Sequence, residues 1–156
     1  MLQLSINALK PLTYHLELGA KLAQLRAHGV ILLGSGNVVH NLGRLRWDEP
    51  DKAFERAARF DEAVVDQLRM DPSAILKVVE HPDYKLAVPT ADHFIPMLYM
   101  AGVAAASGEP MEPLLRGYSM GSLSMTCYGI GTGLGCREED GAATLPADVP
   151  AEQTNI

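Results

Sequence analysis

The chain has 156 residues, of which 47% are hydrophobic and 21% are charged, a composition typical of one globular domain. Its formal net charge of -6 and the lack of a basic stripe argue against a nucleic-acid-binding protein. No apolar run approaches the roughly 20 residues of a membrane-spanning helix, and no secretory signal is visible at the N-terminus. Two cysteines, Cys127 and Cys136, are too few for a disulfide framework, so we expect a cytoplasmic protein with idle thiols.

The first third of the chain predicts a β-α-β unit. Residues 2–6 alternate apolar and polar side chains, as a short strand does. We expect a helix from Pro11 to Gly29, because an apolar stripe runs at helical spacing through Tyr14, Leu18, Leu22 and Leu25. The continuous apolar run of residues 30–33 then predicts a strand buried on both faces. This order favours an α/β fold with a mostly parallel sheet flanked by helices.

The later elements follow from similar signals. Helices are predicted at residues 51–70, 72–80 and 90–105, and closing strands at residues 114–118 and 123–130. Thr90 is expected to cap the third of these helices, which places His93 in its first turn. Residues 131–156 are rich in Gly, Ala, Pro and acidic residues, so we expect a domain at residues 1–130 followed by a disordered tail.

Five histidines are the candidates for chemistry, and their positions separate them. His15 and His28 on the first helix are expected to be surface or capping residues, and His81 before a proline is expected to be structural. His40 instead follows the loop at residues 34–37, just past a predicted strand end, where the ligands of α/β sheets gather. The two glycines of this loop would let the backbone approach a ligand closely. The alternative is an ordinary loop histidine with its hydrogen bonds satisfied.

His93 is the second candidate, because it lies at a predicted helix N-terminus. The helix dipole there disfavours the imidazolium, so the ring stays neutral and able to bind a metal or accept a proton. A capping or packing histidine is the alternative. His40 and His93 are far apart in the chain, so their spacing does not show contact, and zinc or iron sites use at least three protein ligands.

Residues required by three other catalytic or nucleotide-binding motifs are missing from the glycine-containing loop. Gly34-Ser35-Gly36 lacks the Gly-x-Ser-x-Gly pattern of a nucleophile elbow. No Lys-Ser/Thr follows it, as a Walker loop requires, and the third glycine of a dinucleotide-binding fingerprint is missing. An unrelated small α/β hydrolase is therefore disfavoured, because neither a nucleophile nor an oxyanion site is found.

Four segments resemble one enzyme family. Residues 33–42, Leu-Gly-Ser-Gly-Asn-Val-Val-His-Asn-Leu, resemble the third histidine motif of the DODA-type (4,5-DOPA) class III extradiol dioxygenases. Residues 89–99 resemble the family's Thr-Pro-Glu-His-Tyr-Leu-Pro segment, and residues 120–125 resemble its closing Gly-Ser-Leu-Ser-Met strand. Residues 3–6 resemble the strand before the family's helix. The segments occur in family order and cover roughly residues 2–130.

The resemblance implies ring opening of a catechol by O₂ at a non-haem metal, Fe(II) for the reaction and often Zn(II) in isolated protein. It implies that His40 lies at the metal as a ligand and candidate acid/base, and that His93 lies beside it as a ligand or neighbouring group. The chemistry agrees, since iron needs open positions for catecholate and O₂, and a neutral histidine nearby can take the phenolic proton.

The family also carries two N-terminal motifs, Gly-His-Gly-Ser-Pro and Ser-Ala-His-Trp, whose histidines bind the metal and which have no counterpart here. One hypothesis is a partial enzyme, with His40 and His93 as its share of the site and little activity alone. The other is a non-catalytic subunit that pairs with a chain carrying the missing motifs, or a homo-oligomer that covers the exposed sheet edge. No membrane or nucleic-acid partner is expected.

Overall fold

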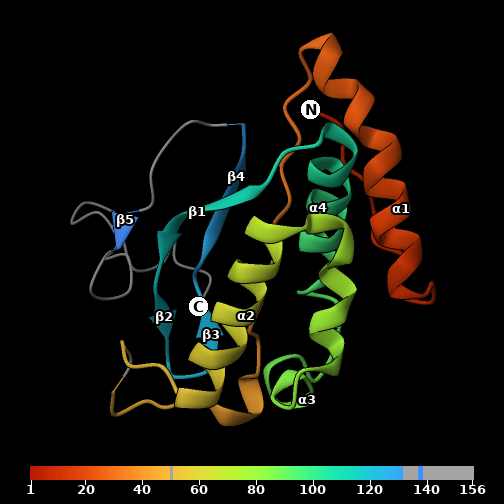
Figure 1. Ribbon diagram of the computed structural model, residues 1–156. Coiled ribbons are helices and arrows are strands. Elements are labelled where there is room, and N and C mark those ends of the chain that lie inside the picture. The colour runs from red at the N-terminus through yellow and green to blue at the C-terminus, as the bar shows by residue number, and fades with distance from the viewer. Residues whose placement is uncertain (50, 132–136, 139–156) are drawn as a thin grey trace.

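The computed structural model describes residues 1–49, 51–131 and 137–138, which form a group of helices beside two small sheets (Figure 1). The helices are α1 (Leu12–Leu22), η1 (Ala23–His28), η2 (Leu42–Arg44), α2 (Glu55–Met70), η3 (Pro72–Glu80), α3 (Tyr84–Ala87) and α4 (Ile95–Ser107). Each predicted helix is present, although α2 begins at Glu55, later than expected. Nearly all of the predicted disordered tail lies outside the described residues. No described helix is long and apolar enough to cross a bilayer.

The strands form one three-stranded and one two-stranded sheet. The larger sheet has the order β4-β1-β5, with β1 at Met111–Arg116, β4 at Cys127–Ile130 and β5 at Arg137–Glu138. The pair β1–β4 is antiparallel and the pair β1–β5 is parallel. The smaller sheet pairs β2 (Tyr118–Ser119) with β3 (Leu123–Ser124) in antiparallel orientation. Helices and sheets together agree with the α/β class, but the predicted mostly parallel sheet is not confirmed.

The two strands expected early in the chain are wrong. Residues 2–6 and 30–33 form neither helix nor strand, and the second segment runs beside α4 on the side of the sheets (Figure 1). Ile31 and Leu33 are 90% and 91% exposed, so the apolar run is not buried on both faces. The physical reason is that a strand exists only through a hydrogen-bonded neighbour, and no described strand pairs with these segments.

Helices α1 and α4 pack at very short distance through a pair of glycines. A Cβ atom on Gly19 would overlap the backbone carbonyl of Tyr99, and one on Gly102 would overlap the carbonyl of Leu16. Across the same contact, His15 Nδ1 lies 2.9 Å from the hydroxyl of Tyr99. His15 is fully buried and is thus not the surface or capping residue expected from the sequence.

The main core lies where α4 meets α2 and η3. Its fully buried side chains include Phe60 and Leu68 of α2 and Ile75 of η3. Phe94, at the N-cap of α4, and Leu98, in α4, are also fully buried. The helix predicted at residues 51–70 buries one face in this core, since its buried positions recur every three or four residues. This core fixes the N-terminal end of α4, the end beside which both candidate histidines lie.

The buried His15 predicts a pH-dependent stability. Burial lowers the pKa of this imidazole below 6.5, so the His15 ring binds a proton more weakly in the folded chain than in the unfolded chain. Stability from the neutral ring is present above about pH 6.5 and declines as the pH falls below it. We expect the free energy of unfolding, measured in urea, to fall between pH 7.5 and 5.5. His15→Gln should reduce this dependence and the exposed His28→Gln should not; equal pH profiles for all three proteins would contradict the assignment.

Candidate active site

His40 lies on a segment that is hydrogen-bonded to β3. His40 forms an antiparallel bridge with Leu123, and its own N–H donates to the Ala87 carbonyl at 2.9 Å. On either side of it, Ser124 N–H donates to Val39 O at 3.0 Å and Asn41 N–H donates to Ser122 O at 3.1 Å. The two motifs at residues 33–42 and 120–125 are therefore bound together, which fixes the backbone that carries His40.

Side chains strengthen the same pairing. The Asn37 amide donates to the Ser124 carbonyl at 2.8 Å, and the Ser122 hydroxyl donates to the Asn41 carbonyl at 2.8 Å. The Asn41 amide donates to the Leu86 carbonyl at 2.7 Å. Asn37, Asn41 and Ser122 thus hold the backbone on either side of His40 in place through hydrogen bonds to carbonyl groups.

His93 lies before the start of α4. The helix begins at Ile95, with Phe94 at the N-cap position and Pro96 in the first turn. The expected cap by Thr90 and the expected place of His93 in the first turn are therefore wrong. The physical reason is local, since residues 91–94 form a turn in which Phe94 N–H donates to Ala91 O at 3.0 Å. The dipole argument for a neutral His93 loses its basis.

The two histidines nevertheless lie against each other. The ring centroids of His40 and His93 are 3.6 Å apart and the rings are inclined by only 10°, which is a stacked pair. Burial, with a smaller contribution from the nearby His93, lowers the pKa of His40, while Asp92 opposes the shift. Asp92 Oδ2 lies 3.8 Å from His93 Nε2. The arrangement offers a neutral His40 imidazole beside a second imidazole and a carboxylate.

The glycines of the loop explain how the rings meet. A Cβ atom on Gly36 would overlap the carbonyl oxygen of His93, and one on Gly34 would lie 2.9 Å from the Met100 side chain and 3.1 Å from the Pro96 carbonyl. We expected these glycines to admit a ligand; they instead admit the backbone of α4 and the turn before it. Their role is to bring the chain that carries His40 against the chain that carries His93.

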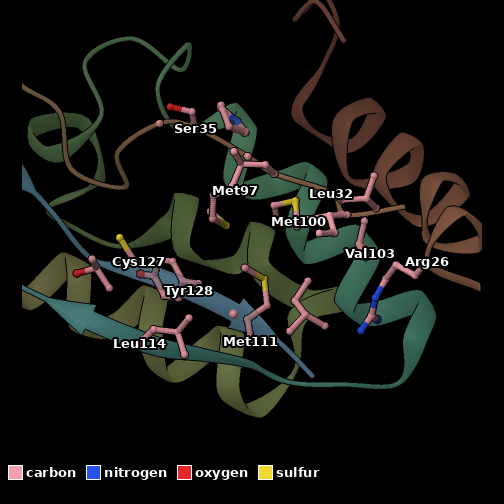
Figure 2. A pocket seen from close by; sticks show the side chains of 18 of the residues that line it. Arg26, Leu32, Ser35, Met97, Met100, Val103, Met111, Leu114, Cys127 and Tyr128 are labelled. Atoms are coloured by element: carbon pink, nitrogen blue, oxygen red, sulfur yellow. The ribbon is translucent and has the colours of Figure 1, made fainter. Parts of the chain in front are cut away.

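A cavity of about 710 Å³ opens beside this loop. Figure 2 shows its wall, to which α4 contributes Met97, Met100 and Val103 and the larger sheet contributes Met111, Leu114 and Tyr128. Ser35 and Gly36 line one part of it, but His40 and His93 do not, among the residues that the structure describes. The cavity thus adjoins the histidine pair without enclosing it.

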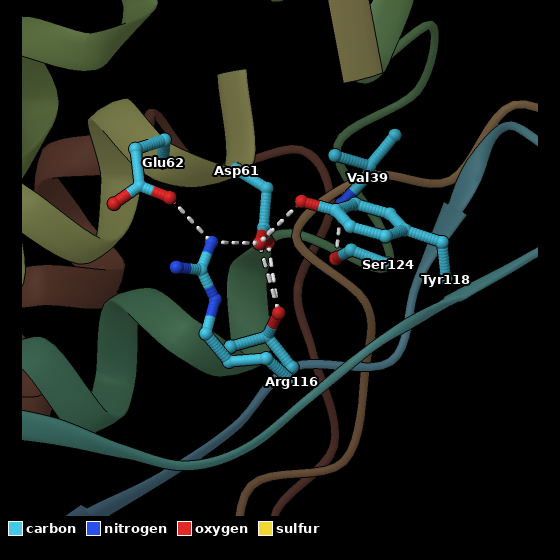
Figure 3. Close-up of polar contacts among 7 residues, drawn as sticks. Val39, Asp61, Glu62, Arg116, Tyr118 and Ser124 are labelled. Atoms are coloured by element: carbon cyan, nitrogen blue, oxygen red, sulfur yellow. Dashed lines mark hydrogen bonds and ion pairs between the residues drawn. The ribbon is translucent and has the colours of Figure 1, made fainter. Parts of the chain in front are cut away.

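A buried carboxylate lies behind the site, and the sequence interpretation did not identify it. Asp61 of α2 is fully buried and accepts hydrogen bonds from Arg116 Nη2 at 3.2 Å, Tyr118 OH at 3.2 Å and Thr126 Oγ1 at 2.9 Å (Figure 3). Burial raises the pKa of the Asp61 carboxyl, although the hydrogen bonds from Thr126 and Arg116 oppose the shift. Burial and the Asp61 charge raise the pKa of the Tyr118 hydroxyl, which therefore stays protonated and donates.

Ser124 connects Asp61 and its three donors to the backbone next to His40. The Ser124 hydroxyl stabilises the Asp61 carboxylate and also accepts the Val39 N–H at 3.2 Å (Figure 3). A sequence signal for Asp61 existed, because it is a charged residue in the apolar stripe of α2, at the spacing of Ala57, Val65 and Leu68. Asp61 therefore positions β3 and, through β3, the backbone beside His40.

The donor set fits only part of a metal site. Neutral imidazoles suit zinc and non-haem iron, but such sites take at least three protein ligands. Within residues 1–49, 51–131 and 137–138, no three His, Cys, Asp or Glu side chains lie close enough to hold one ion. The stacked rings also hold their nitrogen lone pairs in two nearly parallel planes, so one ring must tilt for both to face a common ion. The described residues alone do not form a complete metal centre.

The remaining candidates have structural surroundings. His81 Nδ1 accepts the Asp83 N–H at 3.1 Å and its ring packs edge-on against Phe60, as expected for a structural histidine. Cys127 is a free, exposed thiol. Cys136 lies outside the described residues. None of these side chains adds a donor to the histidine pair.

Comparison with known proteins decides the family. Residues 1–131 match the family model described as the catalytic LigB subunit of aromatic ring-opening dioxygenase. The chain belongs to this LigB family. It is 38% identical over 135 residues to a 4,5-DOPA dioxygenase extradiol of Escherichia coli K12, covering 84% of this chain and 49% of that protein. It is 31% identical over 132 residues to the protein of that name from Portulaca grandiflora, covering 81% of this chain and 47% of that protein.

A solved structure agrees with the sequence relatives. The chain matches the crystal structure of an uncharacterized protein from Escherichia coli K12 with a TM-score of 0.71 and 37% identity, over 78% of this chain and 51% of that chain. This LigB-family chain therefore spans about half the length of the relatives that it matches. The family membership expected from the four resembling segments is confirmed.

Proposed function

We propose that this LigB-family chain provides one half of an extradiol dioxygenase site, which opens the ring of a catechol-type substrate with O₂. The observation that carries the proposal is that the His40 and His93 rings stack, with their centroids 3.6 Å apart. The two histidines belong to motifs that are far apart in the chain. The relatives named 4,5-DOPA dioxygenase extradiol support the substrate class. Residues 1–130 are the proposed share of the domain.

In this proposal His40 and His93 are the chain's share of the metal ligands, for Fe(II) or Zn(II), and further ligands must join them. When its basic nitrogen is not bound to the metal, His40 has instead the properties of a base, because its lowered pKa keeps the ring neutral at pH 7 and the side chain is partly accessible. A neutral imidazole can accept the proton of a catechol hydroxyl in the transition state. The mostly parallel sheet remains a prediction for the completed domain, in which residues 30–33 would gain neighbours.

The chain alone should bind metal weakly and should turn over little or no catechol. The physical reason is the two-histidine donor set, one short of the usual minimum. The measurement is metal analysis of the purified chain after incubation with Fe(II) or Zn(II), together with an assay for the yellow ring-opened product. Robust turnover by the isolated chain would show that the missing ligands are not needed.

A chimera tests the assignment of His40 and His93 directly. Residues 1–131 would replace the matching half of the Escherichia coli relative, so that one polypeptide carries a complete domain. We expect the chimera to cleave catechols, and we expect His40→Ala and His93→Ala each to lower kcat/KM by roughly 10²–10⁴-fold, the usual contribution of acid/base groups. His28→Ala, on η1, is the matched control and should retain activity. An active chimera that keeps its activity in both variants would refute the proposed roles.

A further inference from the structure

The β2–β3 hairpin, residues 117–125, lies beside the segment that carries His40. Its two strands are antiparallel, with Tyr118 opposite Ser124. Strand β3 continues the pairing outward, since Leu123 forms an antiparallel bridge with His40. Backbone pairing of this kind fixes the register and spacing of neighbouring segments. Any shift of the hairpin therefore moves the backbone of His40 with it.

Asp61 of α2 holds both ends of this hairpin (Figure 3). Near the first end, Arg116 Nη2 and Tyr118 OH each donate to Asp61 Oδ2 at 3.2 Å. Just past the second end, Thr126 Oγ1 donates to the same oxygen at 2.9 Å and lies 3.1 Å from Oδ1. Two stretches of chain that frame the hairpin thus converge on one carboxylate, which fixes the hairpin relative to the helical core.

The Ser124 side chain links Asp61 to the residue that precedes His40. Its hydroxyl oxygen accepts the Val39 N–H at 3.2 Å, which leaves the hydroxyl hydrogen free to donate to the Asp61 carboxylate. Ser124 is 1% exposed, so water does not replace either partner. The Val39 peptide is therefore connected to Asp61 through one buried hydroxyl group.

The charge of Asp61 strengthens these contacts. Hydrogen bonds to an ionised carboxylate are roughly twice as strong as neutral ones. Its cation, Arg116, also pairs with Glu62 at 2.7 Å, and Glu62 is 53% exposed. A neutral residue at position 61 would leave Arg116 to the exposed Glu62 and would weaken the bonds from the hydroxyl groups. The hairpin would then lose its charged anchor on α2 while its own strands stay paired.

We propose that Asp61 is a positioning residue of the histidine pair: through the hairpin and the Ser124 hydroxyl, its carboxylate sets how closely the His40 ring approaches the His93 ring. The inference rests on the proposed function for the purpose of that spacing, which is to direct both rings at one metal ion. His93 is positioned separately, because Phe94 beside it is fully buried in the main core. Displacement of the hairpin therefore moves one ring and leaves the other in place, which changes their stacking.

NMR spectra of the histidine ring protons in the full 156-residue chain test the inference. Because the rings stack at 3.6 Å, each shifts the protons of the other upfield, relative to those of the exposed His28. His40→Gln and His93→Gln assign the signals, and each should abolish the upfield shift of the remaining partner. We expect Asp61→Asn and Ser124→Ala each to remove at least half of the upfield shift.

Two further comparisons separate positioning from general destabilisation. The double variant of Asp61→Asn and Ser124→Ala should lose no more of the shift than the larger single effect, because both changes break one connection. Glu62→Gln, at the other partner of Arg116, and Ser119→Ala, in the same hairpin, are the matched controls and should leave the shift unchanged. Spectra are recorded where urea titration shows each variant fully folded, so lost stability alone does not move the signals.

An unchanged upfield shift in Ser124→Ala would overturn the inference even if Asp61→Asn did not fold. Equal losses in Ser119→Ala or Glu62→Gln would overturn it as well, and so would additive losses in the double variant. The ring shifts report geometry and not turnover. An active chimera whose ring shifts do not depend on Asp61 would refute positioning alone, and Asp61-dependent ring shifts beside an inactive chimera would refute the proposed function alone.

Discussion

Replacing Asp61 by alanine should lower the free energy of unfolding by about 3–5 kcal/mol, the usual cost of removing one partner from a buried charge pair. The carboxylate is fully buried, and three donors converge on it, from Arg116, Tyr118 and Thr126. Without it, the Arg116 guanidinium, which is only 19% exposed, loses its buried counter-charge, and the two hydroxyls lose their acceptor. Urea denaturation followed by circular dichroism at pH 7 measures the change.

Glu62 provides the matched control for Asp61, because it pairs with the same Arg116 nitrogen at 2.7 Å but is 53% exposed. Glu62→Ala should cost about 1 kcal/mol or less, as exposed ion pairs do. Asp61→Asn should fall between the two alanine variants, since it keeps the shape and one acceptor oxygen while it removes a charge that burial already penalises. Equal losses for Asp61→Ala and Glu62→Ala would show that burial of the carboxylate does not govern its contribution.

The helices could be predicted from the sequence because their signals are local. The stripe of α2, the helix after Pro11 and the stop at Gly29, which adopts φ 74°, all depend on neighbours within about four residues. Residues 30–33 show the limit of this reasoning. Their composition predicts a buried strand, but a strand also needs a hydrogen-bonded neighbour from elsewhere, and no described strand provides one.

The candidate site divides in the same way. His40 and His93 could be chosen by motif, but only the fold shows that their rings stack. The role of Gly36 could not be inferred, because a glycine that admits a ligand and one that admits another backbone look alike in sequence. Asp61 was detectable as a charge within an apolar stripe, yet its partners lie 55 to 65 residues further along the chain and depend on the packing of the strands on α2.

Gly36 leads to the second large effect. In the chimera that carries a complete domain, Gly36→Ala should weaken Zn(II) or Co(II) binding by roughly 10- to 100-fold, as loss of groups that orient metal ligands does. The added Cβ would overlap the His93 carbonyl oxygen and lie 3.0 Å from Pro96 Cγ, so the loop and the turn before α4 must separate. The same overpacking should lower the free energy of unfolding by about 1–3 kcal/mol. Chelator competition measures the affinity and urea denaturation measures the stability.

Gly43→Ala is the matched control, because it makes the same substitution three residues after His40 in more open surroundings. Its added Cβ would meet only the Asn41 Oδ1 atom at 3.3 Å, and the Asn41 hydrogen bond to Leu86 is made by the other atom of the amide, Nδ2. We therefore expect nearly unchanged affinity and stability. If Gly36→Ala binds metal as tightly as Gly43→Ala, the close contact at Gly36 does not set the spacing of the rings. If metal affinity and stability both fall for Gly36→Ala alone, the glycine acts by keeping the two imidazoles 3.6 Å apart. The close packing of the loop against α4 would then be a requirement for metal binding.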